Sequence, residues 1–111
     1  MNYTIHITKK AEADIESAAD YIEHTLLNPK AADSLLAFAE RKINALSCMP
    51  QSHQLVDDAV LKALGIRYLL IKNYIAFYTI DEVSKTIHII RFLYNKRNWI
   101  HILKAQPANF E

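Results

Sequence analysis

The spacing of hydrophobic positions changes along the chain. Near its start, Tyr3, Ile5 and Ile7 alternate with polar neighbours, which is typical of a short strand with one buried face. From Ile15 to Leu26 the apolar residues recur three or four positions apart, opposite a row of acidic side chains. This stretch predicts an amphipathic helix, and we interpret the acidic row as its solvated face.

A second helix is predicted directly after the first. Asn28 suits an N-cap, and Pro29 suits the first helical position, where a missing N–H costs nothing. An apolar stripe at helical spacing then runs from Ala32 to Leu46, and Pro50 lies beyond its end. The two helices should therefore be antiparallel and joined by a short turn.

The second half of the chain is rich in β-branched and aromatic residues. Strands are predicted at Ile66–Lys72, Tyr74–Ile80 and Thr86–Tyr94, with turns at Lys72-Asn73 and at the segment DEVSK. The final segment WIHIL predicts a short helix or an irregular closing stretch. The resulting order is β-α-α-β-β-β, an α+β fold in which the helices cover one face of a small, mainly antiparallel sheet.

The other face of this sheet should not be bare. The segments YLLI, YIAFYTI and TIHIIRFLY are apolar at nearly every position, whereas a strand with one wet face alternates. We expect a cover over part of the second face, supplied by the C-terminal segment, a second copy of the chain or a different protein.

Length and composition exclude several classes of protein. With 111 residues, 51% of them hydrophobic, the chain predicts a single globular domain spanning residues 1–111. Its one glycine, Gly65, excludes the glycine-rich phosphate loops, so no nucleotide cofactor is expected. The lone Cys48 cannot form an internal disulfide, and no apolar run approaches the roughly 18 residues of a membrane span. We therefore expect a cytoplasmic protein without a membrane anchor.

No metal site is expected from the histidines. The five of them share no metal-ligand spacing, and no cysteine pair supports them. His88 lies within a predicted strand, where a structural, hydrogen-bonded role is favoured and general acid or base catalysis is the alternative.

Charge is unevenly distributed between the two halves of the chain. The net charge is +1, but residues 1–58 hold five Lys/Arg against nine Asp/Glu, a balance of −4. Residues 59–111 hold eight against three, a balance of +5. The second half could present a basic surface to an acidic partner or a phosphate backbone, or the asymmetry could be ordinary surface variation.

Arg91 lies inside an apolar strand, where an unpaired charge would be costly. An ion pair with Asp81, Glu82 or a helix carboxylate is the favoured explanation, and a bound phosphate is the alternative. For Lys96 and Arg97 a bound phosphate is favoured, and an ion pair is the alternative.

Two aromatic residues flank this pair of cations. Lys96 and Arg97 follow the last strand, between Tyr94 and Trp99. Cations bind phosphates and aromatic rings stack on bases, so the cluster is a candidate RNA-binding surface.

Taken together, these segments resemble the RelE/ParE superfamily, the toxins of bacterial type II toxin–antitoxin modules. The resemblance covers nearly the whole chain and is carried by AEADIESAADYI, NPKAADSLLAFAERKINALSCMP, LGIRYLLIKNYIAFYTID and IHIIRFLYNKRNW. It implies the same β-α-α-β-β-β fold. It also implies a cognate antitoxin as partner, with the toxin as a homodimer or within a heterotetramer.

Two activities occur among such toxins. RelE-like members cut mRNA in the ribosome without a metal, and ParE-like members inhibit DNA gyrase without cleaving anything themselves. We expect a ribosome-dependent, metal-independent endoribonuclease. A ParE-like gyrase inhibitor, or a degenerate member that only binds its antitoxin, is the alternative.

The RelE-type roles fall on specific residues. Arg67 and Arg97 would stabilise charge at the scissile phosphate, and Tyr94 would stack or relay a proton, so these three are the expected catalytic residues. The expected RNA-binding residues are Lys96, Arg91, Trp99, Lys62 and Lys72.

The chain also departs from the nuclease pattern. Only Lys62 lies near Arg67, where basic RelE proteins have a lysine pair, and the stretch HILKAQPANF offers His101 and Phe110 in place of a catalytic tyrosine. These departures keep the gyrase alternative open.

Overall fold

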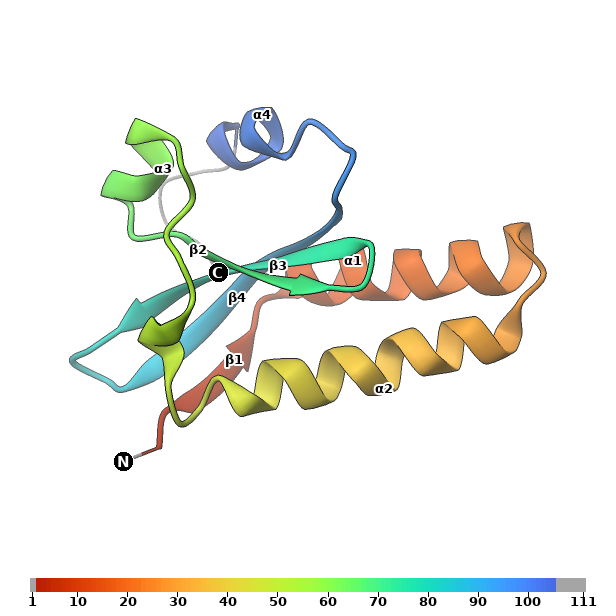
Figure 1. Ribbon diagram of the computed structural model, residues 1–111, viewed down its shortest axis with the longest axis horizontal. Helices are drawn as coiled ribbons and strands as arrows, with labels where there is room; N and C mark the ends of the chain where they lie inside the picture. Colours follow the sequence, from red (N-terminus) through yellow and green to blue (C-terminus); the bar gives the residue numbers. More distant parts are fainter. Residues whose placement is uncertain (1, 106–111) are drawn as a thin grey trace.

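The computed structural model describes residues 2–105 and confirms the predicted α+β architecture. Its four-stranded sheet has the order β1-β4-β3-β2, with β1 parallel to β4 and the other neighbours antiparallel (Figure 1). The strands are β1 (Thr4–Ile7), β2 (Arg67–Ile71), β3 (Tyr74–Asp81) and β4 (Thr86–Tyr94). Phe110, which the sequence offers in place of a catalytic tyrosine, lies outside the described residues.

Two long helices form a hairpin on one face of the sheet. They are α1 (Lys9–Asp20), which continues into the π-helical turn η1 (Tyr21–Thr25), and α2 (Pro29–Ala45). As predicted, Asn28 caps α2 by accepting a hydrogen bond from the backbone N–H of Ala31 at 3.1 Å. The cap and Pro29 together fix where the second helix begins.

Thr8 joins the first helix to the sheet. Its hydroxyl accepts from the backbone N–H of Ala11, which makes it the N-cap of α1, and donates to the carbonyl of Ile89 on β4 at 2.9 Å. It is the buried polar residue at the point where β1 ends, so α1 must continue alongside β4.

The hairpin packs on the sheet through a first hydrophobic core. Small residues let the helices approach closely, and aliphatic and aromatic side chains of the sheet fill the space beneath them. The buried members include Ala11, Ala18, Leu35, Ala39, Ile43, Leu46, Leu69, Ile71, Ala76, Tyr78, Ile87, Ile89 and Phe92.

Short helices cover part of the second face, which explains its apolar strands. Figure 1 shows α3 (Ala59–Ala63) and α4 (Trp99–Lys104) on the side of the sheet opposite to α1 and α2. Asp58 is the N-cap of α3, and α4 confirms the helical form of the closing segment. The second core consists of Val56, Leu61, Ile66, Ile75, Phe77, Ile90, Leu93 and Leu103.

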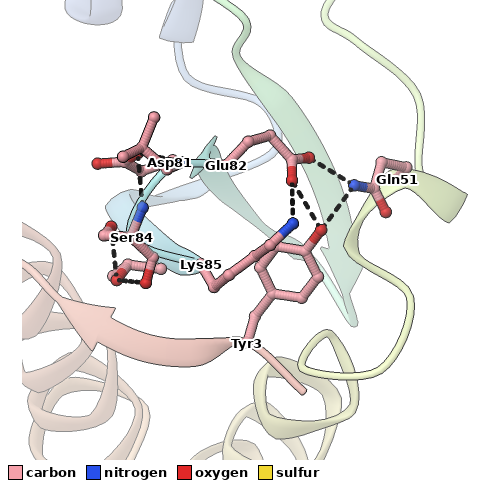
Figure 2. A network of polar contacts seen from close by, with 8 residues as sticks. Tyr3, Gln51, Asp81, Glu82, Ser84 and Lys85 are labelled. Carbon is pink, nitrogen blue, oxygen red and sulfur yellow. Dashed lines mark hydrogen bonds and ion pairs between the residues drawn. The ribbon is translucent and has the colours of Figure 1, made fainter. Parts of the chain in front are cut away.

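A polar network links three distant segments at the far end of the sheet. The Glu82 carboxylate accepts hydrogen bonds from the Tyr3 hydroxyl at 2.9 Å and from the Gln51 amide at 2.7 Å, and pairs with Lys85 at 3.1 Å (Figure 2). These bonds lower the pKa of Glu82, that from Tyr3 most. The network connects the chain start, the 3-10 turn η2 (Pro50–Ser52) and the β3–β4 turn.

Candidate functional site

A cleft opens between the helical hairpin and one end of the sheet. Its volume is about 650 Å³, and α1, η1, the β2–β3 turn, β4 and the turn after β4 contribute to its walls. Three tyrosines and one arginine give it a mixed aromatic and cationic character. The lining residues are Asp14, Ser17, Ala18, Tyr21, Ile22, Leu26, Asn73, Tyr74, Phe92, Tyr94 and Arg97.

A π-helical turn shapes the helical wall of this cleft. The backbone N–H of Leu26 donates to the carbonyl of Tyr21 at 3.1 Å, five residues back, and Leu27 ends the turn with a φ of 54°. Such a turn is wider than an α-helical turn and is frequent at functional sites. Here Tyr21 and Leu26 are more than half exposed beside the cleft, at 53% and 55%.

Aromatic rings form the sheet wall. The Tyr74 ring stacks on Phe92 with centroids 5.1 Å apart, and meets Tyr94 edge to face at 5.6 Å. Burial raises the pKa of Tyr74, and the neighbouring hydroxyls of Tyr94 and Tyr21 add to the rise. Tyr94 is 39% exposed, so its hydroxyl can contact a partner while Tyr74 supports its ring.

A β-bulge places Tyr94 opposite Tyr74. The register of β3 and β4 shifts between Phe77 and Tyr78, with Ile90 as the extra residue of β4. Without that residue Tyr74 would lie opposite Leu93, and Tyr94 would not face it.

Asp14, which lines the cleft, binds the strand arginine. The Arg91 guanidinium binds the Asp14 carboxylate through two bonds, Nε–Oδ2 at 2.6 Å and Nη2–Oδ1 at 3.0 Å. The backbone N–H of Phe92 donates to the same carboxylate at 3.0 Å. The predicted ion pair with a helix carboxylate is therefore confirmed. A role of Arg91 in RNA binding stays a prediction.

The other predicted site residues near the cleft are Tyr94, Lys96 and Arg97. All three are exposed, and Tyr94 and Arg97 both line the cleft. The backbone N–H of Arg97 donates to the carbonyl of Tyr94 at 3.1 Å, which fixes the turn that carries the two cations. The structure thus brings one of the two expected catalytic arginines together with the expected tyrosine.

Arg67 lies elsewhere. Its guanidinium donates to the carbonyl of His53 at 2.6 Å and to that of Gln51 at 3.4 Å. Across the sheet, Tyr94 is paired with Tyr74, which is paired with Ile71 of β2. Ile71 is four residues from Arg67, a separation of about 13 Å at the usual rise of a strand. Arg67 and Arg97 therefore belong to different ends of the sheet.

Arg67 instead neighbours a buried tyrosine. The Tyr78 hydroxyl donates to the carbonyl of Pro50 at 2.6 Å. Burial raises the pKa of Tyr78 to about 12, although the charge of Arg67 opposes the rise. Together the two side chains hold the η2 turn against the sheet.

The three remaining predicted RNA-binding residues are dispersed. Lys62 is exposed on α3, and Lys72 occupies the β2–β3 turn with a φ of 55° and its ammonium 5.4 Å from the Phe38 ring centroid. The Trp99 ring packs at 5.3 Å on Phe77 in the second core. Its packing role leaves Tyr94 as the more accessible aromatic of the pair that flanks the cations.

Several residues of the cleft could not be identified from sequence patterns. Asp14 lies outside the predicted acidic row, and its spacing does not show that it is the helix carboxylate that pairs with Arg91. Leu26 belongs to the predicted apolar stripe of an ordinary helix and Tyr21 falls outside that stripe, because spacing does not reveal a π-helical turn. Tyr74 was seen only as a strand residue.

Residues 5–99 match the sequence profile of the family described as the ParE toxin of the type II toxin–antitoxin system, parDE. The chain therefore belongs to the ParE toxin family. No curated protein sequence matches it significantly.

Two solved structures share the fold. One, from the chromosomal ParDE toxin–antitoxin system of P. aeruginosa, has a TM-score of 0.68 and 20% identity, covering 83% of this chain and 95% of that one. The other, from the RelBE2 toxin–antitoxin complex of Mycobacterium tuberculosis, has a TM-score of 0.58 and 21% identity, covering 85% and 99%. Within residues 2–105, no helix is both long and apolar enough to cross a membrane.

Proposed function

We propose that this chain is a ParE-like toxin that binds DNA gyrase and stops DNA replication, and that it does not cleave RNA itself. Membership of the ParE family supports this, and so does the higher TM-score against the ParDE structure than against the RelBE2 structure. The sequence had favoured a RelE-like nuclease over a gyrase inhibitor, and the proposal reverses that order.

The arrangement of the arginines carries the proposal. Metal-free cleavage of RNA needs several cations around one scissile phosphate, aimed at the charge that develops there. Here Arg67 is held by two backbone carbonyls, Arg91 is paired with Asp14, and Arg97 lies at the other end of the sheet from Arg67. An exposed cleft lined by aromatic residues and a cation is better suited to bind another protein than to cleave a phosphate bond.

A RelE-like nuclease is the second candidate, and one feature favours it. Tyr94, Lys96 and Arg97 share one turn and are all exposed, so they could contact an RNA backbone on the ribosome. A degenerate member that binds only its antitoxin is the third.

We further infer that the cleft receives an antitoxin segment. Exposed Tyr21 and Leu26 stand on one side of it and Tyr94 on the other, so an amphipathic segment could bury apolar side chains between them. An acidic residue of that segment could pair with Arg97.

Induction of the chain in a bacterium separates the three candidates. Pulse labelling of DNA and protein synthesis should show that DNA synthesis fails first, while primer extension finds intact mRNA. Early loss of protein synthesis with ribosome-dependent mRNA cuts would establish the RelE-like activity instead. Unimpaired growth at full expression would indicate the degenerate member.

Site variants test the same proposal. Arg97→Ala and Tyr94→Ala should each abolish toxicity. Arg97→Ala should leave Tm almost unchanged, since an exposed side chain adds little to stability, whereas Tyr94→Ala also loses the ring contact with Tyr74. Lys30→Ala, which removes an exposed cation at the start of α2, is the matched control and should stay toxic. Arg67→Ala should also stay toxic under the gyrase mechanism, whereas a nuclease that uses Arg67 would lose its activity.

A further inference from the structure

Two histidines far apart in sequence meet on the surface of the sheet. His6 on β1 and His88 on β4 are partners in the parallel register. Their Nδ1 atoms are 2.8 Å apart, and the rings meet edge to face with centroids 5.0 Å apart. Sequence spacing could not reveal the pair, because 82 residues separate its members.

The pair lies on an open part of the second sheet face. Ile87 and Ile89 belong to the first core, and adjacent side chains on a strand point to opposite faces, so His88 points away from the helical hairpin. His6 is exposed and His88 is half-buried, so solvent and solutes reach the two rings.

The two Nδ1 atoms are close enough to share one hydrogen bond. A hydrogen bond between two Nδ1 atoms requires one ring to carry its proton on Nδ1 and the other to present a lone pair. If both rings move their proton to Nε2, two lone pairs converge on the space between them. A metal ion bound by two imidazoles at the usual 2.0–2.1 Å needs nitrogens about 2.9–3.4 Å apart, which the pair reaches by a shift of a few tenths of an ångström.

We propose that His6 and His88 form a binding site for one divalent transition-metal ion of the kind that imidazole prefers, such as Zn²⁺ or Ni²⁺. Within residues 2–105 no third His, Cys, Asp or Glu completes a metal-binding group, so water fills the remaining positions.

A bound ion would connect β1 to β4. The ladder between these strands is only four residues long, and β1 is an edge strand. A ligand that binds the folded state alone raises its stability by mass action. The ion would therefore stabilise the N-terminal strand, and this effect does not depend on the activity of the toxin.

Calorimetric titration of the full chain without an affinity tag tests the site. Titrated separately with ZnCl₂ and NiCl₂, the wild type should bind one ion per chain, and its Tm should rise with metal concentration. His6→Gln and His88→Gln should each weaken binding at least tenfold. His24→Gln, at an exposed histidine of η1, and Cys48→Ser, at the exposed thiol, are the controls and should bind as the wild type does.

A measurement without substitutions guards against variants that fail to fold. The ¹⁵N spectrum of the wild-type imidazoles should show both rings as Nε2–H tautomers with metal-bound Nδ1 after one equivalent of Zn²⁺. Absence of binding by the wild type would overturn the proposal. Equal binding by His6→Gln and His88→Gln, or zinc-induced shifts confined to other histidines, would do so as well.

Discussion

Replacing Arg91 tests whether its charge serves the fold. Arg91→Met keeps much of the apolar stem and removes the guanidinium, so that among residues 2–105 the Asp14 carboxylate keeps the hydrogen bond from the N–H of Phe92 alone. The two side chains are only 12% and 15% exposed, so water cannot fully replace the lost partner. Breaking a buried pair by removing one partner costs about 3–5 kcal/mol, and the residual exposure favours the lower end of that range.

Urea unfolding measures the free energy of unfolding and heating measures Tm, each followed by circular dichroism and by Trp99 fluorescence. For a domain of this size a loss of about 3 kcal/mol lowers Tm by roughly 12 °C. Asp14→Asn separates charge from hydrogen bonding, because an amide oxygen can still accept from Phe92. We expect it to be destabilised, but less than Asp14→Ala.

A double-mutant cycle isolates the interaction itself. Arg91→Met combined with Asp14→Ala should cost clearly less than the two single changes together, by about 1–3 kcal/mol, since neither partner is then left alone. Lys85→Met is the matched control: it breaks an ion pair with Glu82 whose members are 44% and 53% exposed, and stability should hardly change. A stable Arg91→Met protein that has lost only its toxicity would refute the structural role and move Arg91 into the site.

Two further predictions concern other parts of the fold. Because the pKa of Tyr78 is raised to about 12 in the folded state and lies near 10 when unfolded, stability should fall as pH rises above 10, by about 2 kcal/mol at pH 12. Tyr78→Phe should flatten that slope and cost about 1–2 kcal/mol at neutral pH, since the carbonyl of Pro50 loses its donor; equal pH slopes in the two proteins would count against the assignment. Asn28→Ala should lower the free energy of unfolding by about 1 kcal/mol through loss of the α2 N-cap, whereas Asn44→Ala, near the end of the same helix, should not.

Local patterns predicted the elements well. The strand at Thr86–Tyr94 was predicted with its observed bounds, because β-branched residues and turn signals define it. The start of α2 was also correct, since Asn28 and Pro29 act within one helical turn. The five-residue helix α3 was missed, because it is too short to show a helical period.

The candidate site depended on features that spacing does not record. The cleft depends on a single extra residue at Ile90, which turns Tyr94 to face Tyr74. It also depends on the π-helical turn, which places Tyr21 beside it. The separation of Arg67 from Arg97 follows from strand register, so a list of cations in the sequence could not show that they lie apart.

A DNA supercoiling assay with purified components tests the proposed function most directly. The chain is added to DNA gyrase, ATP and relaxed plasmid, with Arg97→Ala as the inactive comparison and Lys30→Ala as the active one. We predict that the wild type and Lys30→Ala inhibit supercoiling in proportion to their concentration, and that Arg97→Ala does not. Undiminished supercoiling in excess wild-type protein, together with cleavage of ribosome-bound mRNA by the same preparation, would contradict the account.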